Sequence, residues 1–409
     1  MKKILAGSLL GNIVEYYDFG IYTVFATTIG QLFFPPVGDS WAVILALIVF
    51  SLGFMMRPLG GIVFGYIGDK FGRKKALIIS MLGMSFSTLS LGLLPSYEEI
   101  GIFASIFLVI IRLIQGLCIG GEGTGSAIYI IEHGAKRIAL MGGVIMTSNI
   151  LGTLLANLVA FFLNSVFDLN HNNWSWAFFL GFFMGITVLY IRIHNHETPA
   201  FEKFKEKKKT KMPVIEVLVK KKYALFTTIA IAASASSLMY LVRGYLNIFL
   251  QSHLGFSTDL SLKYTIYTLI TLAILLPLAG LLTDKIGIRR VLNLGITLTI
   301  LGILPAWYLI VTQENLIVGL LLISLMGALM GAPAYPHAIH SFPPEIRYSG
   351  IALGWNLGNA IFGGTTPLIS ALTIEKIGIM GPAFYLLFTS SIFLLLRFWA
   401  TFYIKKLKV

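Results

Sequence analysis

Apolar runs of roughly 20 residues, the length that a helix needs to cross a bilayer, recur along this whole chain. Open sheet edges cannot face lipid, and the runs are too long and too apolar for the strands of a membrane barrel. Hydrophobic residues make up 56% of the 409 residues. Charged residues make up only 12%, about half the usual share in a soluble protein. The sequence therefore predicts an all-α polytopic membrane protein.

We expect twelve transmembrane helices in two six-helix bundles. A lysine-rich polar segment, His194–Lys222, separates six apolar runs from the other six. It predicts an N-terminal six-helix bundle over 1–192, a cytoplasmic linker over 193–222 and a C-terminal six-helix bundle over 223–409. The predicted spans are 4–34, 41–68, 76–95, 100–132, 138–167, 174–192, 223–252, 260–283, 291–312, 316–341, 347–372 and 381–404.

The net charge of +13 could indicate a protein that binds nucleic acid, but the positions of the basic residues argue against this. Most of the 31 Lys and Arg fall in loops or tails on one side of the twelve spans, with only Lys263 and Lys376 on the other. This positive-inside pattern predicts a bacterial inner membrane protein with both termini in the cytoplasm, with the lipid bilayer and not nucleic acid as its partner. The start, MKKILAGSLLGNIV, resembles a signal peptide without a small-residue cleavage site, so we expect it to stay as the first span.

Two short loops repeat in register along the chain. GYIGDKFGRKK matches GLLTDKIGIRR at an offset of 215 residues, as from Asp69 to Asp284. Each copy joins the second predicted span of its half to the third. An internal repeat of six spans on six is typical of carriers whose halves rock about a central site near mid-membrane. The repeat therefore favours a carrier of a small solute over a channel or an enzyme.

The stretch GNIVEYYDFG in the first span holds two carboxylates, Glu15 and Asp18, three residues apart and close to mid-membrane. A carboxylate at the centre of a span costs roughly 2.5–3.5 kcal/mol, so such groups mark functional sites. Two acids this close disfavour double ionisation, and we expect one of them to hold a proton at neutral pH. We interpret them as proton-coupling residues, with a structural ion pair to Arg57 or Arg112 as the alternative.

Three arginines within spans are candidate substrate contacts. Arg57, in MMRPLGG, binds a substrate carboxylate or neutralises a first-span acid. Arg112 lies ten residues before Glu122 on the fourth span, so Arg112 could face a first-span acid while Glu122 pairs with Arg57 or joins the proton coupling. Arg243 in the seventh span presents a planar donor fork to a carboxylate, or else snorkels to the outer interface.

Further polar or aromatic positions line the substrate cavity or hold helices together. His337 and His340 lack a neighbouring acid or cysteine, so we expect no metal site there. The glycines around Glu122 lack the sequence of a phosphate-binding loop and indicate close helix packing, so we expect no cofactor and the proton as coupling ion. The remaining candidate substrate-binding positions are Tyr22, Tyr240, Asn149, Trp355 and Asn356, with Asn359 beside them.

Four longer blocks resemble the major facilitator superfamily, and within it the metabolite:proton symporter branch that contains proline/betaine, α-ketoglutarate, citrate and shikimate transporters. The resemblance covers essentially the whole chain and implies proton-coupled uptake of a small organic acid or zwitterion by alternating access. We expect the protein to function as a monomer. The resemblance also implies that Asp69, Arg73, Asp284 and Arg290 pair across the halves and close an inner gate, although their charges alone would equally suit topology anchors. The blocks are GNIVEYYDFGIY at 11–22, GFMMRPLGGIVFGYIGDKFGRK at 53–74, RLIQGLCIGGEGTG at 112–125 and RYSGIALGWNLGNAIFGGTTP at 347–367.

The chain departs from the family pattern at several positions. Tyr16 stands where the family has Trp, Gly123 where an aromatic often follows GGE, and Val242–Tyr245 where a Thr-Tyr pair is common. The sequence stops at Val409 without the charged coiled coil of the osmosensing members, which argues against osmotic regulation. Proton-driven efflux on the same fold is one alternative. A membrane redox or proton-pumping subunit is another, but it would need paired haem-ligating histidines, and the seven histidines fall mostly in loops.

Overall fold

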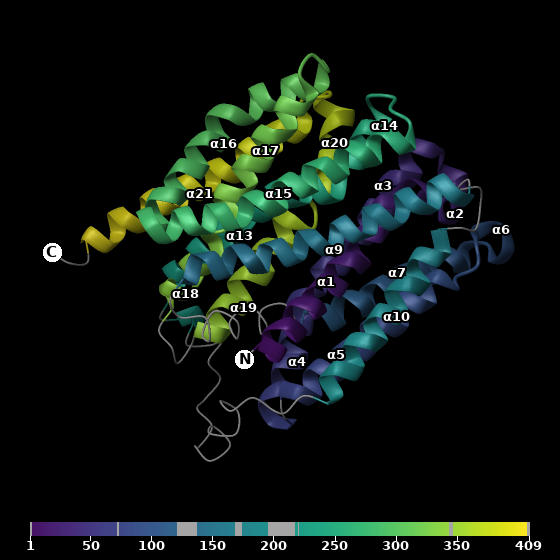
Figure 1. The fold of residues 1–409 in the computed structure, drawn as a ribbon, viewed down its shortest axis with the longest axis horizontal. Coiled ribbons are helices and arrows are strands. Elements are labelled where there is room, and N and C mark those ends of the chain that lie inside the picture. The colour runs from purple at the N-terminus through teal and green to yellow at the C-terminus, as the bar shows by residue number, and fades with distance from the viewer. Residues whose placement is uncertain are drawn as a thin grey trace. The chain divides into compact units, whose positions relative to one another are not determined.

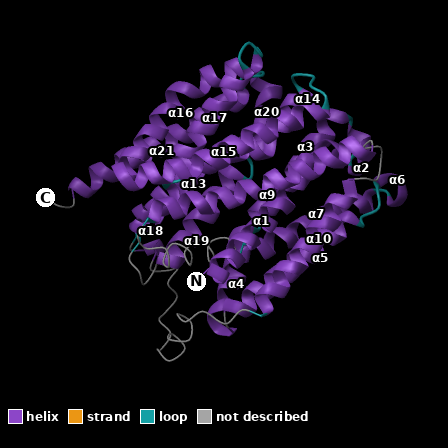
Figure 2. Ribbon diagram, in the orientation of Figure 1, coloured by secondary structure: helices purple, strands orange, loops and turns teal. Residues whose placement is uncertain are grey.

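The computed structural model describes residues 2–71, 73–120, 137–167, 174–194, 217–219, 221–342 and 347–406. In this part of the chain all regular structure is helical and no strand occurs (Figure 2). Ten helical stretches there are long and apolar enough to cross a membrane, judged by length and composition. A shorter apolar stretch, Gly381–Leu395, belongs to the last helix. The predicted all-α polytopic class is confirmed.

Most predicted spans are single helices, but the first, second, seventh, tenth and eleventh are interrupted. Two short helices, η1 (Pro35–Val37) and α6 (Tyr97–Ile100), lie in connecting segments. The helices of the first half are α1 (Lys2–Val24), α2 (Ala26–Phe33), α3 (Asp39–Met55), α4 (Arg57–Phe71), α5 (Arg73–Gly92), α7 (Ile102–Ile119), α9 (Ile138–Phe167) and α10 (Trp174–Ile193). Those of the second half are α13 (Lys222–Tyr240), η2 (Leu241–Tyr245), α14 (Leu246–Ser252), α15 (Thr258–Ile286), α16 (Ile288–Val311), α17 (Leu316–Gly331), α18 (Ala334–Ser341), α19 (Arg347–Gly358), η3 (Asn359–Gly363), α20 (Thr366–Ile377) and α21 (Gly381–Lys406).

Prolines account for two of the interruptions. Pro58 has no backbone N–H and its ring clashes with a preceding helical turn, so α3 ends and α4 begins immediately before it. Pro333 lies in the same way between α17 and α18. Proline thus converts single predicted spans into pairs of shorter helices.

Two other interruptions are π-helices, η2 and η3. In each, a backbone N–H bonds to the carbonyl five residues earlier, Leu246 to Leu241 and Gly364 to Asn359. π-helices are rare and occur frequently at functional sites. The segment Val242–Tyr245, where the sequence departs from the family pattern, lies inside η2.

The chain forms two compact units, each described here by itself. Within unit 1, α5 and α10 lie side by side, as do α16 and α17 within unit 2 (Figure 1). The predicted domain limits at 192 and 222 stay predictions. Unit 1 comprises Met1–Ile130, Ser148–Lys211 and Phe256–Ile266, and unit 2 comprises Ile131–Thr147, Met212–Gly255 and Tyr267–Val409.

Helices α3, α4 and α7 of unit 1 touch backbone to backbone. A Cβ atom on Gly116 of α7 would lie 1.9 Å from the carbonyl oxygen of Gly53 on α3. A Cβ atom on Gly60 of α4 would lie 1.9 Å from the carbonyl oxygen of Leu117 on α7. Small residues allow such close approach, and the resulting dispersion contacts hold helices together inside a membrane. The contact therefore fixes where the neighbouring polar side chains of α7 lie.

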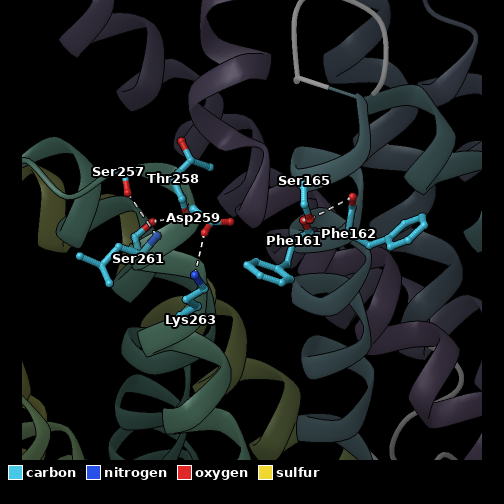
Figure 3. A network of polar contacts seen from close by, with 9 residues as sticks. Phe161, Phe162, Ser165, Ser257, Thr258, Asp259, Ser261 and Lys263 are labelled. Atoms are coloured by element: carbon cyan, nitrogen blue, oxygen red, sulfur yellow. Dashed lines mark hydrogen bonds and ion pairs between the residues drawn. The ribbon is translucent and has the colours of Figure 1, made fainter.

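The beginning of α15 is joined to the end of α9 inside unit 1. Lys263 Nζ lies 2.8 Å from Asp259 Oδ2, one helical turn earlier, and 5.6 Å from the centre of the Phe161 ring (Figure 3). On α9, the Ser165 hydroxyl donates to the Phe161 carbonyl oxygen at 2.5 Å. The Lys263 and Asp259 side chains are 46% and 40% exposed, so we expect the ion pair itself to contribute at most about 0.5 kcal/mol.

We expect Gly116→Ala to destabilise the protein by about 1–3 kcal/mol or more, because the new methyl group would overlap a backbone carbonyl that moves only with its helix. Gly327→Ala on α17 is the matched control, since the nearest atom to a Cβ there lies at an ordinary 3.5 Å. Thermal unfolding of the detergent-purified variants measures the difference. Equal melting temperatures for the two variants would contradict the backbone contact.

Candidate functional site

The two carboxylates of α1 are buried in unit 1. The exposed fraction is 2% for Glu15 and 1% for Asp18. An ionised carboxylate this deep is stable only when other groups compensate for its lost hydration. The compensation differs between the two acids, and this difference organises the site.

Glu15 lies beside an arginine at the beginning of α4. Arg57 Nη2 is 3.6 Å from Glu15 Oε1, and both side chains are at most 4% exposed. The Arg57 guanidinium also lies 4.0 Å from the centre of the Phe54 ring and 4.6 Å from that of Phe19. Aromatic faces attract a cation and shield it from apolar surroundings. Of the two interpretations of Arg57, this geometry favours neutralisation of a first-span acid.

Arg112 on α7 is fully buried against aromatic rings and an amide. Its guanidinium lies 4.1 Å from the centre of the Tyr22 ring and 5.0 Å from that of Phe19. Its Nη1 donates to Gln115 Oε1 at 2.5 Å. The Tyr22 hydroxyl donates to the Ala46 carbonyl oxygen at 3.0 Å, so Tyr22 presents its ring face, not its hydroxyl, to the arginine.

Asp18 receives a hydrogen bond from a neutral hydroxyl. Thr88 Oγ1 on α5 donates to Asp18 Oδ2 at 2.7 Å, and Gln115 Nε2 donates to Thr88 Oγ1 at 3.0 Å. Among the described residues no donor reaches the second oxygen, Asp18 Oδ1. The backbone of α10 passes close to that oxygen, since a Cβ on Gly181 would lie 2.6 Å from it. Hydrogen bonds thus run from Arg112 through the amide and the hydroxyl to Asp18.

Asn149 holds α9 to α1. The Asn12 amide donates to Asn149 Oδ1 and, at 2.8 Å, to the Ser148 hydroxyl, and all three side chains are buried. Nearby, a Cβ on Gly152 would lie 2.3 Å from the Ile13 carbonyl oxygen, so the two backbones are in contact. Of the two interpretations of Asn149, this arrangement favours a bond between helices.

Arg243 of unit 2 lies in the π-helix η2. Its guanidinium carbon is 3.9 Å from the centre of the Tyr240 ring, and the residue is 8% exposed. Close by, Gly363 of η3 packs against α13, because a Cβ there would lie 2.6 Å from Ser236 Cβ and 3.1 Å from the Tyr240 ring. The same Cβ would lie 2.6 Å from Asn359 Oδ1. Residues of both π-helices therefore contact the Tyr240 ring of α13.

An aromatic pair forms a second feature of unit 2. The rings of Tyr335 on α18 and Trp355 on α19 are stacked, with centroids 4.1 Å apart and planes 22° apart. Each residue is 5% exposed, and Asn356 beside them is 8% exposed. Stacked rings present a polarisable, electron-rich face that suits a cationic group.

A titratable contact joins η2 to the end of α14. The Tyr245 hydroxyl lies 3.3 Å from His253 Nε2, so the last residue of η2 is tied to the residue after α14. Burial lowers the pKa of the His253 imidazole from its ordinary value, and the Glu375 carboxylate opposes this shift. A neutral imidazole with an unprotonated Nε2 accepts a hydrogen bond from the Tyr245 hydroxyl.

The structure describes the side chains of two of the four predicted gate residues. Asp284 accepts hydrogen bonds from the backbone N–H groups of Ala139 and Leu140, both at 3.0 Å. These donors lie in the first turn of α9, where the helix dipole favours a carboxylate. Arg290 is exposed on α16. The gate role of these residues stays a prediction.

Other predicted positions fall on parts with less detail. Asp69 and Arg73 lie in α4 and α5, in stretches whose side chains are not described, and Glu122 lies outside the described residues. His340 Nδ1 is 2.7 Å from the Pro336 carbonyl oxygen. No group of three or more metal-ligating side chains occurs among the residues that the structure describes.

Thr88 and Gln115 were missed by the sequence analysis. A threonine in an apolar span gives no signal, because its hydroxyl can bond to the carbonyl one turn earlier. Gln115 did offer a signal, since an amide three residues after Arg112 faces the same side of a helix. Buried arginine needs acceptors, and Gln115 was the nearest one along α7.

The model of the Major Facilitator Superfamily matches residues 8–273 and 258–408 of this chain. The chain belongs to this superfamily. As a major facilitator it is a membrane transporter and not an enzyme, and the predicted twelve-helix fold of two six-helix bundles is confirmed.

Two similar relatives refine this placement. The proline/betaine transporter of Escherichia coli K12 is 33% identical over 407 residues, which cover 95% of this chain and 81% of the relative. The glycine betaine/proline/ectoine/pipecolic acid transporter OusA of Dickeya dadantii is 32% identical over 415 residues, covering 97% of this chain and 82% of OusA.

Solved structures show the same fold at greater distance. The proton:xylose symporter XylE of E. coli superposes with a TM-score of 0.78 at 20% identity, covering 98% of this chain and 95% of XylE. The human organic anion transporter MFSD10 reaches a TM-score of 0.66 at 17% identity, covering 98% of this chain and 99% of MFSD10.

We expect Glu15→Gln to lower the free energy of unfolding by about 3–5 kcal/mol, because it leaves the buried cation of Arg57 without its carboxylate. The double variant Glu15→Gln/Arg57→Met removes both charges and should recover most of the loss. Melting temperatures in detergent measure both. A single variant as stable as the wild type would show that the ion pair contributes nothing.

Proposed function

We propose that this major facilitator is a proton-coupled symporter that takes up a small zwitterionic or anionic metabolite by alternating access. The observation that carries the proposal is the contrast between the two buried acids of α1. Glu15 lies beside the cation of Arg57, whereas Asp18 is bonded to the neutral hydroxyl of Thr88. An acid bonded to a hydroxyl can change its protonation state without leaving a counter-charge exposed inside the protein.

Asp18 is therefore our candidate for the proton-carrying group. Protonation of Glu15 would remove the negative charge that lies beside the buried cation of Arg57, which is costly. The Thr88 hydroxyl beside Asp18 can donate a hydrogen bond to the ionised carboxylate and can accept one from the protonated carboxyl. Acids within membrane spans mark proton relays in many pumps and transporters. Glu15 has a positioning role in this proposal, and the part played by Glu122 stays a prediction.

The substrate class follows from the relatives and from unit 2. The relatives named above transport proline, betaines, ectoine or pipecolic acid, which combine a carboxylate with a cationic or neutral nitrogen. The planar fork of Arg243 suits the carboxylate. The stacked faces of Tyr335 and Trp355 suit a quaternary ammonium group. We therefore expect a proline- or betaine-like solute.

The setting of the transporter is part of the same proposal. The chain spans the inner membrane of a bacterium with both termini in the cytoplasm, which the one-sided distribution of its basic residues supports. It works as a monomer in the lipid bilayer, and the proton is its coupling ion, without another cofactor.

We expect Asp18→Asn to abolish proton-driven accumulation, because an amide at this position cannot carry a proton. Liposomes that contain the purified protein and an internal pH-sensitive dye measure this when proline or glycine betaine is added outside. The wild type should acidify the interior, and Asp18→Asn should not. Asp259→Asn, which alters a half-exposed acid of α15, is the control and should behave as the wild type.

The opposite outcomes are equally clear in this assay. Full accumulation by Asp18→Asn would refute its role as proton carrier. Alkalinisation of the interior by the wild type under a substrate gradient would replace symport by antiport and efflux.

We expect Arg243→Lys to raise the KM for a carboxylate-bearing solute by about ten-fold or more, because lysine keeps the charge but loses the planar fork and the stacking on Tyr240. Initial rates of uptake into liposomes give the KM. Arg289→Lys, an exposed arginine on α16, is the matched control. An unchanged KM would remove Arg243 from the substrate site.

A further inference from the structure

The hydrogen bonds between Arg112 and Asp18 have a fixed direction. Arginine is a donor only, so the atom of Gln115 that faces Arg112 at 2.5 Å must be its amide oxygen. The amide nitrogen then faces Thr88, and Thr88 Oγ1 accepts from it at 3.0 Å. The direction of each bond up to Thr88 thus follows from arginine being a donor only.

The Thr88 hydroxyl has one proton and two acceptors in reach. Asp18 Oδ2 lies 2.7 Å from Thr88 Oγ1, and the carbonyl oxygen of Met84, one turn earlier on α5, lies 3.1 Å from it. An ionised carboxylate is the stronger acceptor, so the proton points to Asp18 when Asp18 is charged. The Met84 carbonyl is the second place for the same proton.

Protonation of Asp18 reverses one bond only. When a proton from the aqueous side binds Asp18 Oδ2, the protonated carboxyl donates a hydrogen bond to Thr88 Oγ1. The Thr88 hydroxyl proton stays on the threonine and turns towards the Met84 carbonyl oxygen. The Thr88 oxygen now accepts from Asp18 and from Gln115, which its two lone pairs allow. On Oδ1 the proton would find no acceptor among the described residues, and an unsatisfied buried donor is costly.

We propose that Thr88 is a positioning residue whose hydroxyl switches between Asp18 and Met84, so that Asp18 stays bonded to the Gln115–Arg112 pair whether it is ionised or protonated. The inference rests on the proposed role of Asp18 as proton carrier. In this arrangement Asp18 gains and loses its proton while the hydrogen bond between Gln115 and the buried Arg112 stays in place. Gln115 is the second positioning residue, since it fixes the direction of the bonds.

The charged and titratable groups around Asp18 are few. From α7 the charge of Arg112 acts on it, and the neutral phenol of Tyr17 is its neighbour on α1. The Tyr17 hydroxyl donates to the Ala177 carbonyl oxygen of α10 at 2.8 Å. Glu15 on α1 lies at Arg57 of α4. From α5 and α10 the groups at Asp18 are uncharged, the Thr88 hydroxyl and the backbone at Gly181.

The experiment is an infrared titration of the purified protein, which follows the carboxyl C=O band of protonated Asp18 against pH. Asp18→Asn assigns the band. Thr88→Val keeps the side chain's shape but removes the hydroxyl. The ionised form loses a charge-assisted bond and the protonated form only a neutral one. We therefore expect the midpoint to move to higher pH by about one unit, a ten-fold change in proton affinity.

Two further variants make the test specific. Thr88→Ser keeps the hydroxyl and should return the midpoint to that of the wild type. Thr153→Val removes a buried threonine hydroxyl of α9 that bonds only to its own helix, at 3.3 Å from the Asn149 carbonyl oxygen, and should leave the midpoint unchanged. Thr88→Cys, with a weaker donor, should lie between serine and valine, and it serves if the valine variant does not fold.

The outcomes separate this inference from the proposed function. A midpoint shared by wild type and Thr88→Val, or a serine variant that behaves like valine, overturns the switch. The titration needs no substrate, so it tests Thr88 even if the liposome assay shows no symport. A wild type that symports protons while Thr88→Val titrates unchanged would leave the proposed function standing and refute only the role of Thr88.

Discussion

The burial of charged side chains among tightly packed helices is the constraint on which unit 1 depends. Two carboxylates and two arginines lie almost fully buried there, on the three helices α1, α4 and α7. Each charge is matched by another group, with Glu15 beside Arg57, aromatic rings against both guanidinium groups, and a hydroxyl at Asp18. These contacts are possible only where the helix backbones come very close. The glycine contacts between α3, α4 and α7 give that closeness.

The chemistry is divided between the units in our proposal. Unit 1 holds the buried acids and a directed set of hydrogen bonds, which suit the binding and release of a proton. Unit 2 holds an arginine on a π-helix and a stacked aromatic pair, which suit the two ends of a zwitterion. Such a division allows the solute-binding residues of unit 2 to differ between relatives with different solutes, while the proton-binding residues of unit 1 keep their role.

Much of this could be predicted from the sequence, and the limits have physical causes. Apolar runs and the positions of buried charges stand out because lipid penalises every exception. The break at Pro58 was visible in principle, since proline cannot continue the hydrogen bonds of α3. Thr88 could not be found, because hydroxyls are tolerated anywhere in a span. The π-helices were hidden as well, since one shifted bond leaves no trace in composition or periodicity.

The π-helix at Leu241–Tyr245 has a consequence for how this span evolves. A bond to the fifth residue back accommodates one residue more than an α-helical turn does, so everything beyond it is rotated by about 100° from an unbroken helix. Asn247 and its neighbours in α14 therefore face a direction set by the bulge and not by α13. Gain or loss of a single residue there would turn a new set of side chains inward while α13 keeps its packing. At the bulge, a one-residue insertion or deletion can therefore change which side chains α14 presents to its neighbours.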